Sequence, residues 1–230
     1  MSDDMLRWPG GWARLGAWRG RSDIAYLAVG ASYPPSRELV DQWLGALRGR
    51  GFDRVVTNAL GPAETLPFVD AGFRVQERLH LLHHDLLDIP ESTLETRRAR
   101  AADRPTILEV DHRAFPPFWQ LDADGLEQAI AATPTARIRV VDGDDGVAAY
   151  AVTGRADRRG YLQRVAVDPT HQGAGRGRGL VLDALRWLRR HRARNAIVNT
   201  QLDNEVALHL YQSCGFREQP SGLCVMGRAL

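Results

Sequence analysis

Hydrophobic positions in the second half of the chain alternate between strand-like and helix-like spacing. Two β-rich runs, at 136–142 and 146–154, flank the turn-forming stretch "GDDG", and this pattern predicts a hairpin. Further strands are expected at 105–110, 160–168, 196–200 and 223–230. Helical spacing predicts helices at 122–133, with Asp122 as the N-cap, at 176–192, and at 204–214, where Gly215 ends the helix. Such alternation is typical of an α/β protein.

The first half repeats part of this pattern. The segment at 39–58 resembles the segment at 180–200, and the Leu-Val pair and Asn58 of the first match the Leu-Val pair and Asn199 of the second at the same separation. Likewise "DAGF" parallels "SCGF", and "IAYLAVG" parallels "YLQRVAV". We interpret this as an internal duplication with a partial first copy. The expected organisation is a partial domain at 1–88, a polar linker at 89–104 and a full domain at 105–230.

Composition narrows the class of protein. The chain has 230 residues, 44% hydrophobic and 25% charged, as in an ordinary globular protein, and its formal net charge is +2. No apolar run approaches the roughly 18 residues of a membrane-spanning helix, so no membrane partner is expected. The N-terminus lacks an apolar signal core, so a cytoplasmic location is expected. All 30 basic residues are arginine, which excludes chemistry that needs a lysine, such as Schiff-base formation.

Cysteine and histidine give little support for a metal centre. The two cysteines, Cys214 and Cys224, are too few for a disulfide framework or a four-ligand zinc site, and both are expected to be reduced and partly buried. Three histidines lie near an acidic residue in "LHLLHHDL", and on a strand His80 and His84 would share a face. We interpret this stretch as edge-strand surface, and no metal is expected.

A basic stretch, "RWLRRHRAR" at 186–194, falls on a predicted helix. Nucleic-acid binding would explain its charge. Because the net charge is small and aromatic interleaving suited to base stacking is absent, we interpret the stretch as a solvated helix face. No nucleic-acid partner is expected.

The stretch "HQGAGRGRGL" at 171–180 places four glycines between a predicted strand and a predicted helix. The G-x-G-x-x-G dinucleotide pattern does not fit, because its sixth position holds Arg178 or Leu180, and the P-loop pattern fails for lack of a lysine. Glycines let backbone amides approach an anion, and the start of a helix adds free N–H donors and a favourable dipole. The loop therefore predicts a pyrophosphate site, to which Arg176 and Arg178 add positive charge; the alternative is a mobile connection. The first copy has two prolines at this place, which cannot donate N–H groups.

The loop and its flanks resemble a known family. "VAVDPTHQGAGRGRGLVL" is similar to the acetyl-coenzyme-A-binding signature of the GNAT N-acetyltransferase superfamily, whose Gln/Arg-x-x-Gly-x-Gly/Ala core matches Gln172, Gly175 and Gly177. "NTQLDNEVALHLYQSCGF" resembles the family's second signature. The resemblance covers roughly residues 104–230 fully and 6–88 weakly. It implies an α/β (α+β) fold with a mixed, mostly antiparallel sheet flanked by helices, in two related halves.

The resemblance also implies an activity. An acetyl group would move from acetyl-coenzyme A to a primary amine, either on a small molecule or at a protein N-terminus. The alternative is a non-catalytic acyl-CoA-binding sensor or scaffold. The chain is expected to be a monomer or a homodimer.

The resemblance implies functional roles for the positions that match the family's motifs. The coenzyme would be held by Val165, Ala166, Val167, Gln172, Gly173, Ala174, Gly175, Arg176, Gly177, Arg178 and Asn204. Its pantetheine arm would bind backbone groups of the strand before the loop, in a slot made where this strand splays from the one at 196–200. Tyr211 takes the place of the acid that protonates the leaving thiolate.

The acceptor site and the general base are less defined. Many relatives carry a glutamate on the strand before the loop, but this strand reads "YLQR" at 161–164 and holds no carboxylate. The base candidates elsewhere, none singled out by spacing, are Glu109, Asp111, His112 and Asp122. For the acceptor, Phe115, Trp119 and Gln163 are expected contacts. The aromatic, proline-rich stretch at 111–122 either lines the acceptor site or plugs the core; both interpretations stand.

Overall fold

The computed structural model describes residues 4–144 and 146–230, and the chain forms two compact units. Unit 1 comprises Met1–His80, Gln201–Asp203 and Pro220–Leu230, and unit 2 comprises Leu81–Thr200 and Asn204–Gln219. Both units are discontinuous in sequence, whereas the expected domains at 1–88 and 105–230 are continuous. The expected linker at 89–104 belongs to unit 2.

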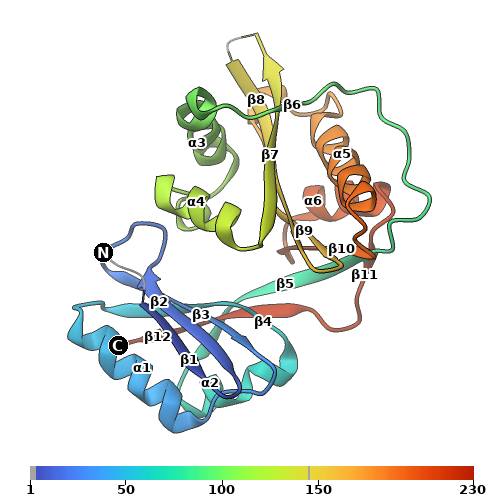
Figure 1. The fold of residues 1–230 in the computed structure, drawn as a ribbon. Helices are drawn as coiled ribbons and strands as arrows, with labels where there is room; N and C mark the ends of the chain where they lie inside the picture. The colour runs from blue at the N-terminus through green and yellow to red at the C-terminus, as the bar shows by residue number, and fades with distance from the viewer. Residues whose placement is uncertain (1–3, 145) are drawn as a thin grey trace. The chain divides into compact units, whose positions relative to one another are not determined.

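Unit 1 is a six-stranded sheet with helices α1 and α2 against one face (Figure 1). Its elements are β1 (Asp4–Trp8), β2 (Gly11–Ala17), β3 (Ile24–Ala31), α1 (Arg37–Gly49), β4 (Arg54–Leu60), the short helix η1 (Pro62–Glu64), α2 (Leu66–Asp70), β5 (Arg74–His84) and β12 (Leu223–Ala229). The strand order is β1-β2-β3-β4-β12-β5, and β3 and β4 form a parallel pair. The apolar stripe of α1 explains the packing: Val40, Trp43, Leu44 and Leu47 are all buried against the sheet.

The parallel strands β3 and β4 pair only over Ile24–Leu27 and Arg54–Thr57. Beyond this point the side chain of Asn58 takes the place of the missing strand partner. Its Oδ1 accepts a hydrogen bond from the Val29 N–H at 2.8 Å, and its Nδ2 donates to the Val29 carbonyl at 3.1 Å. The side-chain amide of Asn58 therefore closes the gap between β3 and β4.

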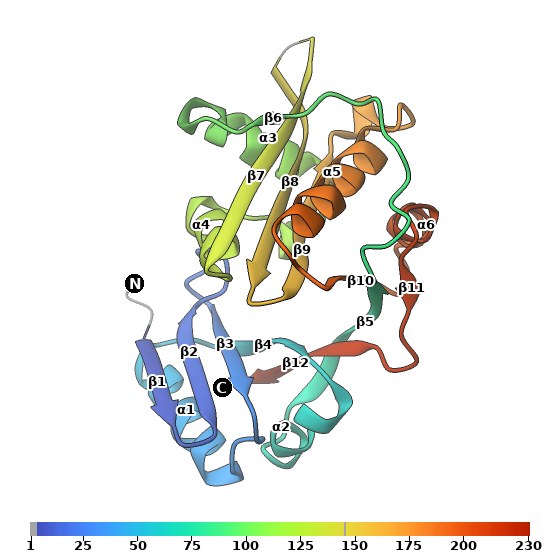
Figure 2. The same cartoon turned by 45° about the vertical axis from the view of Figure 1, so that its right-hand side comes forward.

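Unit 2 carries helices on both faces of its sheet. The elements are β6 (Arg97–Arg98), η2 (Ala101–Asp103), α3 (Arg104–Ala114), η3 (Pro117–Trp119), α4 (Ala123–Ala131), β7 (Thr135–Gly143), β8 (Gly146–Ala156), β9 (Arg159–Val167), η4 (Pro169–His171), α5 (Arg176–Arg190), β10 (Asn195–Gln201), α6 (Glu205–Ser213) and β11 (Arg217–Glu218). The strand order is β6-β7-β8-β9-β10, with only β9 and β10 parallel. Helices α3 and α4 cover one face, and α5 covers the other (Figures 1 and 2).

Most of the elements expected from sequence are confirmed. The β7–β8 hairpin is present, although its turn residue Asp145 lies outside the described residues. Asp122 caps α4 by accepting a hydrogen bond from the Gly125 N–H at 2.7 Å. Helix α6 ends before Gly215, whose φ of +95° is the left-handed conformation expected of a C′ glycine.

The strand expected at 105–110 is wrong, because these residues lie in helix α3. Ile107, Val110 and Asp111 are its buried residues, and their spacing is that of one helix face. The opening strand of unit 2 is instead β6, within the segment that we expected to be a linker. The aromatic stretch after Asp111 therefore follows a helix, not a strand.

Each unit completes its sheet with residues from the other half of the sequence. Strand β12, at the end of the chain, lies between β4 and β5 and completes the sheet of unit 1. The last residues of β5 belong in turn to unit 2, where His83 pairs with Arg217 of β11. Each unit therefore contains a segment contributed by the other half of the sequence.

His84, expected on an edge-strand surface, is buried with 2% of its surface exposed. Its Nδ1 accepts a hydrogen bond from the Leu86 N–H at 2.8 Å, so the ring proton resides on Nε2, which faces the Cys214 carbonyl at 3.1 Å. Burial lowers the pKa of His84, with Asp85 acting in the opposite direction. The two cysteines are free and more buried than expected: Cys214 is 0% exposed and Cys224 is 9% exposed.

Candidate functional site

The glycine loop of unit 2 begins where β9 ends. After the short helix η4, Gly173 and Gly175 adopt φ values of +79° and +73°, which side-chain-bearing residues rarely adopt. A Cβ at either position would meet nothing within 4 Å. The backbone conformation, and not lack of space, therefore requires these two glycines.

The other two glycines of the loop are closely packed, and only at Gly179 is the space too small for a Cβ. A Cβ at Gly177 would lie 3.3 Å from Leu210 Cδ2 and 3.4 Å from Val167 Cγ2. A Cβ at Gly179 would lie 2.2 Å from Leu94 Cδ2, so Leu94 of the segment before β6 packs directly on the helix backbone. The first turn of α5 is thereby held against α6, β9 and this segment.

Free amides gather at the start of α5. The N-cap is Gly175, which has no side chain to cap the helix, and the first turn contains no acidic residue. The Gly179 N–H bonds to the Gly175 carbonyl at 2.9 Å, so the amides before it have no partner one turn back in the helix. Arg176 and Arg178 lie in the same turn, with Arg176 Nη1 donating to the His171 carbonyl at 3.0 Å. N–H groups without a partner in the helix, the helix dipole and two guanidinium groups together favour an anion.

An open strand edge lies next to the loop. Strands β9 and β10 pair only over Arg159–Tyr161 and Asn195–Ile197, although β9 continues to Val167. The Asp168 N–H donates to the Ala148 carbonyl of β8 at 2.9 Å, so by strand alternation the backbone groups of Val165 and Val167 face away from β8. The expected splay between the two strands is present, and it leaves these groups without a neighbouring strand.

A β-bulge in β9 places two consecutive side chains on one face. Arg164 pairs with Val152 and Leu162 with Thr153, which leaves Gln163 as the extra residue. Gln163 lies over Gly154, and Arg164 reaches Asp111 of α3, so both face the side of α3 and α4. Within the described part of the chain, Gln163 Oε1 is buried without a hydrogen-bond partner.

Arg164 and Asp111 form a buried ion pair. Arg164 Nε donates to Asp111 Oδ2 at 2.7 Å, and Nη2 donates to Oδ1 at 2.8 Å. The Tyr150 hydroxyl donates to Oδ2 at 2.5 Å, and the Leu121 N–H donates to Oδ1 at 2.7 Å. Asp111 is 0% exposed and all its contacts come from donors, so it is not free to accept a proton from a substrate.

The other three base candidates lie elsewhere. Asp122 caps α4, and His112 Nε2 lies 2.8 Å from the Leu121 carbonyl, to which it can donate. Glu109 is exposed on α3 and lies 3.9 Å from Arg113 in an ion pair. None of these candidates lies on β9 beside the open edge.

Tyr211 and Asn204 both come from the region of α6. Tyr211 is 6% exposed and packs against Phe216, and burial raises the pKa of its phenol above the usual value. Asn204 is the N-cap of α6, where its Oδ1 accepts from the Ala207 N–H at 3.0 Å. That bond leaves the side-chain N–H₂ of Asn204 available to a ligand.

Two of the expected acceptor residues meet at Arg164. The Arg164 Cζ atom lies 3.4 Å from the centre of the Phe115 ring, and its Nη2 donates to the Trp119 carbonyl at 2.7 Å. Phe115 also packs on the core cluster beneath α3. The structure therefore brings Phe115, Trp119 and the bulge residues to one face of unit 2.

Sequence reasoning missed the residue that fixes the start of the loop. Asp168 accepts hydrogen bonds from the Thr170 N–H at 2.9 Å and the Thr170 hydroxyl at 2.6 Å, and from Arg113 Nε at 2.6 Å. These hydrogen bonds, led by that from Thr170, lower the pKa of Asp168 despite its burial. The Asp-Pro-Thr stretch signals such a capped turn, but the contact with Arg113 has no local signal.

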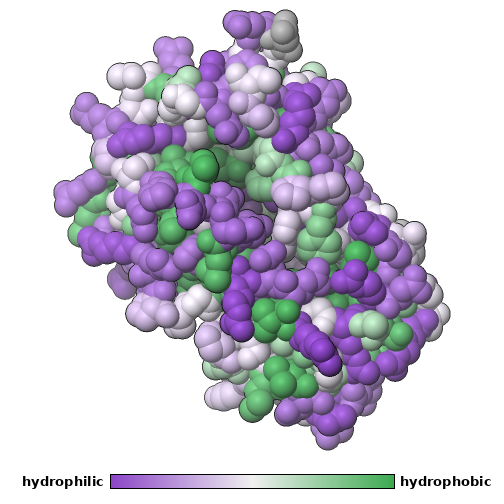
Figure 3. Space-filling view, turned by 180° about the vertical axis from the view of Figure 1, so that it is seen from behind, coloured by the Kyte–Doolittle hydropathy of each residue, from purple (hydrophilic) through white to green (hydrophobic). Residues whose placement is uncertain are grey.

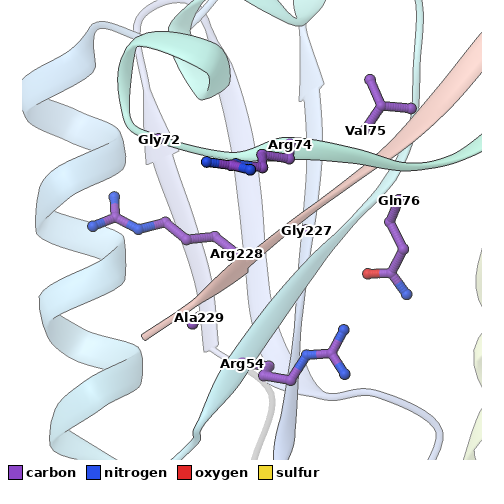
Figure 4. A pocket seen from close by; sticks show the side chains of 8 residues that line it. All are labelled: Arg54, Gly72, Arg74, Val75, Gln76, Gly227, Arg228 and Ala229. Carbon is purple, nitrogen blue, oxygen red and sulfur yellow. The ribbon is translucent and has the colours of Figure 1, made fainter.

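Other surfaces of the described chain offer less. A hollow of about 470 Å³ in unit 1 is lined by Arg54, Arg74 and Arg228, but the guanidinium groups of Arg54 and Arg228 point in opposite directions (Figure 4). Across residues 4–144 and 146–230, no cluster of three His, Cys, Asp or Glu side chains is placed to hold a metal. Nor does any described helix have the length and apolarity to cross a membrane. In unit 2, Figure 3 shows hydrophobic residues gathered around a hollow in the surface.

A family model matches much of unit 2, and curated relatives match part of the chain. Residues 104–216 match the model of the acetyltransferase (GNAT) family. A mycothiol acetyltransferase from Saccharopolyspora erythraea is 31% identical over 121 residues, which cover 50% of this chain and 40% of that protein. A mycothiol acetyltransferase from Amycolatopsis mediterranei is 42% identical over 60 residues, which cover 26% of this chain and 20% of that protein. The chain thus spans less than half the length of these curated relatives.

Solved structures match nearly the whole chain. A tandem GNAT protein from the clavulanic acid biosynthesis pathway aligns with a TM-score of 0.68 and 15% identity, covering 96% of this chain and 79% of that one. A GCN5-related N-acetyltransferase from Kribbella flavida aligns with a TM-score of 0.66 and 14% identity, covering 98% and 89%. At such identities the likeness concerns the fold, and it confirms the expected mixed, mostly antiparallel sheet flanked by helices.

Proposed function

Since the chain belongs to the GNAT acetyltransferase family through residues 104–216, we propose that unit 2 transfers an acetyl group from acetyl-coenzyme A to a primary amine. The observation that carries this proposal is the open edge of β9 running directly into the glycine loop. An extended amide-containing chain fits a strand edge without a partner, and a diphosphate fits unpaired amides at a helix start.

The residues present fit the coenzyme. Backbone groups of Val165 and Val167 would bond its pantetheine arm, whereas those of Ala166, an expected contact, face β8 and are not available to it. The Gln172 N–H already donates to the Pro169 carbonyl, so the amides of 173–178 would hold the diphosphate, aided by Arg176 and Arg178. Asn204 would donate from its free amide. When bound, acetyl-coenzyme A supplies a thioester, whose carbonyl carbon a neutral amine attacks. Tyr211 is protonated at neutral pH even at its ordinary pKa of about 10, and it would donate that proton to the leaving thiolate. Burial raises this pKa further, which weakens Tyr211 as an acid, so the donation depends on its position beside the thiolate.

The acceptor amine would lie on the side of α3 and α4, against Phe115, Trp119 and Gln163. The buried Gln163 Oε1, which has no partner within the described chain, can accept a hydrogen bond from an amine. Because β9 carries no carboxylate, the amine is expected to lose its proton to water. An α-amine, with a pKa of about 8, reacts more readily under these conditions than an alkylamine with a pKa above 10.

The test combines binding with turnover. Calorimetry measures acetyl-coenzyme A binding to the parent protein and to Gly175→Ala, and free-thiol release measures turnover with a panel of amines. The left-handed backbone at Gly175 costs a side-chain-bearing residue about 1–2 kcal/mol. If the bound loop must keep this shape, that cost corresponds to about 5- to 30-fold weaker binding.

Gly51→Ala is the matched control, because Gly51 has a φ of +83°, equal open space and a place in unit 1. It should lose comparable stability and bind acetyl-coenzyme A like the parent. No binding at millimolar acetyl-coenzyme A would refute the proposal. Tight binding with no thiol release for any amine would instead support an acyl-CoA sensor or scaffold.

A further inference from the structure

The Arg164–Asp111 pair connects the bulge of β9 to the segment that follows α3. Each carboxylate oxygen of Asp111 accepts two hydrogen bonds, one from Arg164 and one from either Tyr150 or Leu121. Arg164 reaches two more residues of this segment, through the Trp119 carbonyl and the Phe115 ring. One guanidinium group and its carboxylate thus contact the segment at its beginning, middle and end.

Stability alone does not account for such a pair. Removing two charges from water costs several kcal/mol per ion, and well-packed hydrophobic residues often replace a buried ion pair without loss. What the pair adds is geometry, because a bidentate arginine fork fixes both the distance and the plane of the two groups. Here it fixes residues 115–121 against Gln163, which precedes Arg164 in the bulge.

We propose that Arg164, through Asp111, is a positioning residue for the acceptor amine. It holds the backbone of residues 115–121 so that Phe115 and Trp119 form one wall of the acceptor site beside Gln163. The inference rests on the proposed acetyl transfer and deepens it. Arg164 does not reach the coenzyme loop in this arrangement: its hydrogen bonds go to Asp111 and Trp119.

The variant Arg164→Lys tests this assignment, because lysine keeps the charge but loses the two-pronged fork. The KM for the amine should rise between about tenfold and a hundredfold, the scale of an ångström misplacement of a substrate. The dissociation constant for acetyl-coenzyme A should stay within twofold of the parent value. Asp111→Asn keeps the shape but weakens the pair, and it should raise the KM for the amine less than Arg164→Lys does.

Asp183→Asn is the matched control. Asp183 of α5 pairs with Arg137 of β7 at 2.5 Å and lies 3.8 Å from Arg139 Nε, so the variant weakens largely buried ion pairs of unit 2 that do not involve residues 115–121. It should leave both constants unchanged. Equal changes in amine KM and coenzyme binding, or no change in either, would overturn the positioning role.

Hydrogen exchange provides a readout that does not need turnover. In Arg164→Lys, the amides of Phe115 and of residues 118–121, including the Leu121 N–H, should exchange at least tenfold faster, while those of α5 keep the parental rate. Unchanged exchange at 115–121 would also overturn the assignment. A parent protein that binds acetyl-coenzyme A but transfers nothing would contradict the proposed function, and the exchange result would still decide whether Arg164 fixes the segment.

Discussion

Because Asn58 closes the gap between β3 and β4 in unit 1, we can predict how much stability is lost when its side chain is removed. When the pair Tyr26–Val56 is aligned with the pair Tyr161–Ile197, Asn58 corresponds to Asn199. The Asn58 side chain accepts a hydrogen bond from the Val29 N–H at 2.8 Å and donates one to the Val29 carbonyl at 3.1 Å, whereas Asn199 is exposed. The same residue type at matching positions thus has a structural contact in one unit only.

Asn58→Ala removes both bonds and leaves a donor and an acceptor of Val29 without a partner. A typical hydrogen bond contributes about 1 kcal/mol net, so the free energy of unfolding should fall by about 2 kcal/mol, or more if the gap stays dry. For a chain of this size, that loss lowers the midpoint of thermal unfolding by roughly 4–8 °C. Urea denaturation, with the slope checked for constancy, measures the free energy directly.

Asn199→Ala is the control and should change the free energy of unfolding by less than about 0.5 kcal/mol. If the two variants lose the same stability, the contacts of Asn58 do not close the gap. The closure also predicts that calorimetry finds one acetyl-coenzyme A per chain, since the backbone of Val29, the counterpart of Val165 once the bulge residue is skipped, is already occupied. A stoichiometry of two would refute the argument.

Three further predictions concern stability. Burial lowers the pKa of His84 below its unfolded value of about 6.5, so the unfolded chain binds the proton first as the pH falls. The free energy of unfolding should therefore decrease as the pH drops below about 6.5. His84→Gln should flatten this pH dependence, measured by urea titrations across about pH 5–8. Gly179→Ala should destabilise the protein by about 1–3 kcal/mol through its clash with Leu94, and the double variant with Leu94→Gly, which also removes the clashing Leu94 Cβ, should show non-additive losses in the same assay. Gly45→Ala, on the exposed face of α1 with open space around it, should raise the free energy of unfolding by about 0.5–1 kcal/mol.

The sequence was sufficient to predict features of the fold that depend only on neighbouring residues. Gly173 and Gly175 stand out in sequence because they lie in a glycine-rich stretch between a predicted strand and a predicted helix, and the structure adds that both have left-handed φ values. Asp122 and Gly215 mark helix ends for the same kind of reason. Such features depend on a few neighbouring residues, so a single sequence contains the whole signal.

The errors concern residues whose partners are distant in sequence. The run at 105–110 is short and contains β-branched residues, and its helical spacing becomes clear only when Asp111 is counted as buried. That burial depends on Arg164 and Tyr150, more than thirty residues away. For the same reason Asp111 stood among the possible bases: an unpaired carboxylate and a paired one look alike in sequence.

The place of β12 also has a consequence for how the protein is made. Residues 223–229 supply a central strand of unit 1, between two strands that leave the ribosome more than a hundred residues earlier. During synthesis, at about 5–20 residues per second, the facing edges of β4 and β5 stay unpaired for roughly 7–30 seconds after they emerge. The nascent N-terminal half therefore presents unpaired strand edges to chaperones and to other chains until residues 223–229 have been made and can pair with them. Splitting the gene at the duplication boundary would make that exposure permanent.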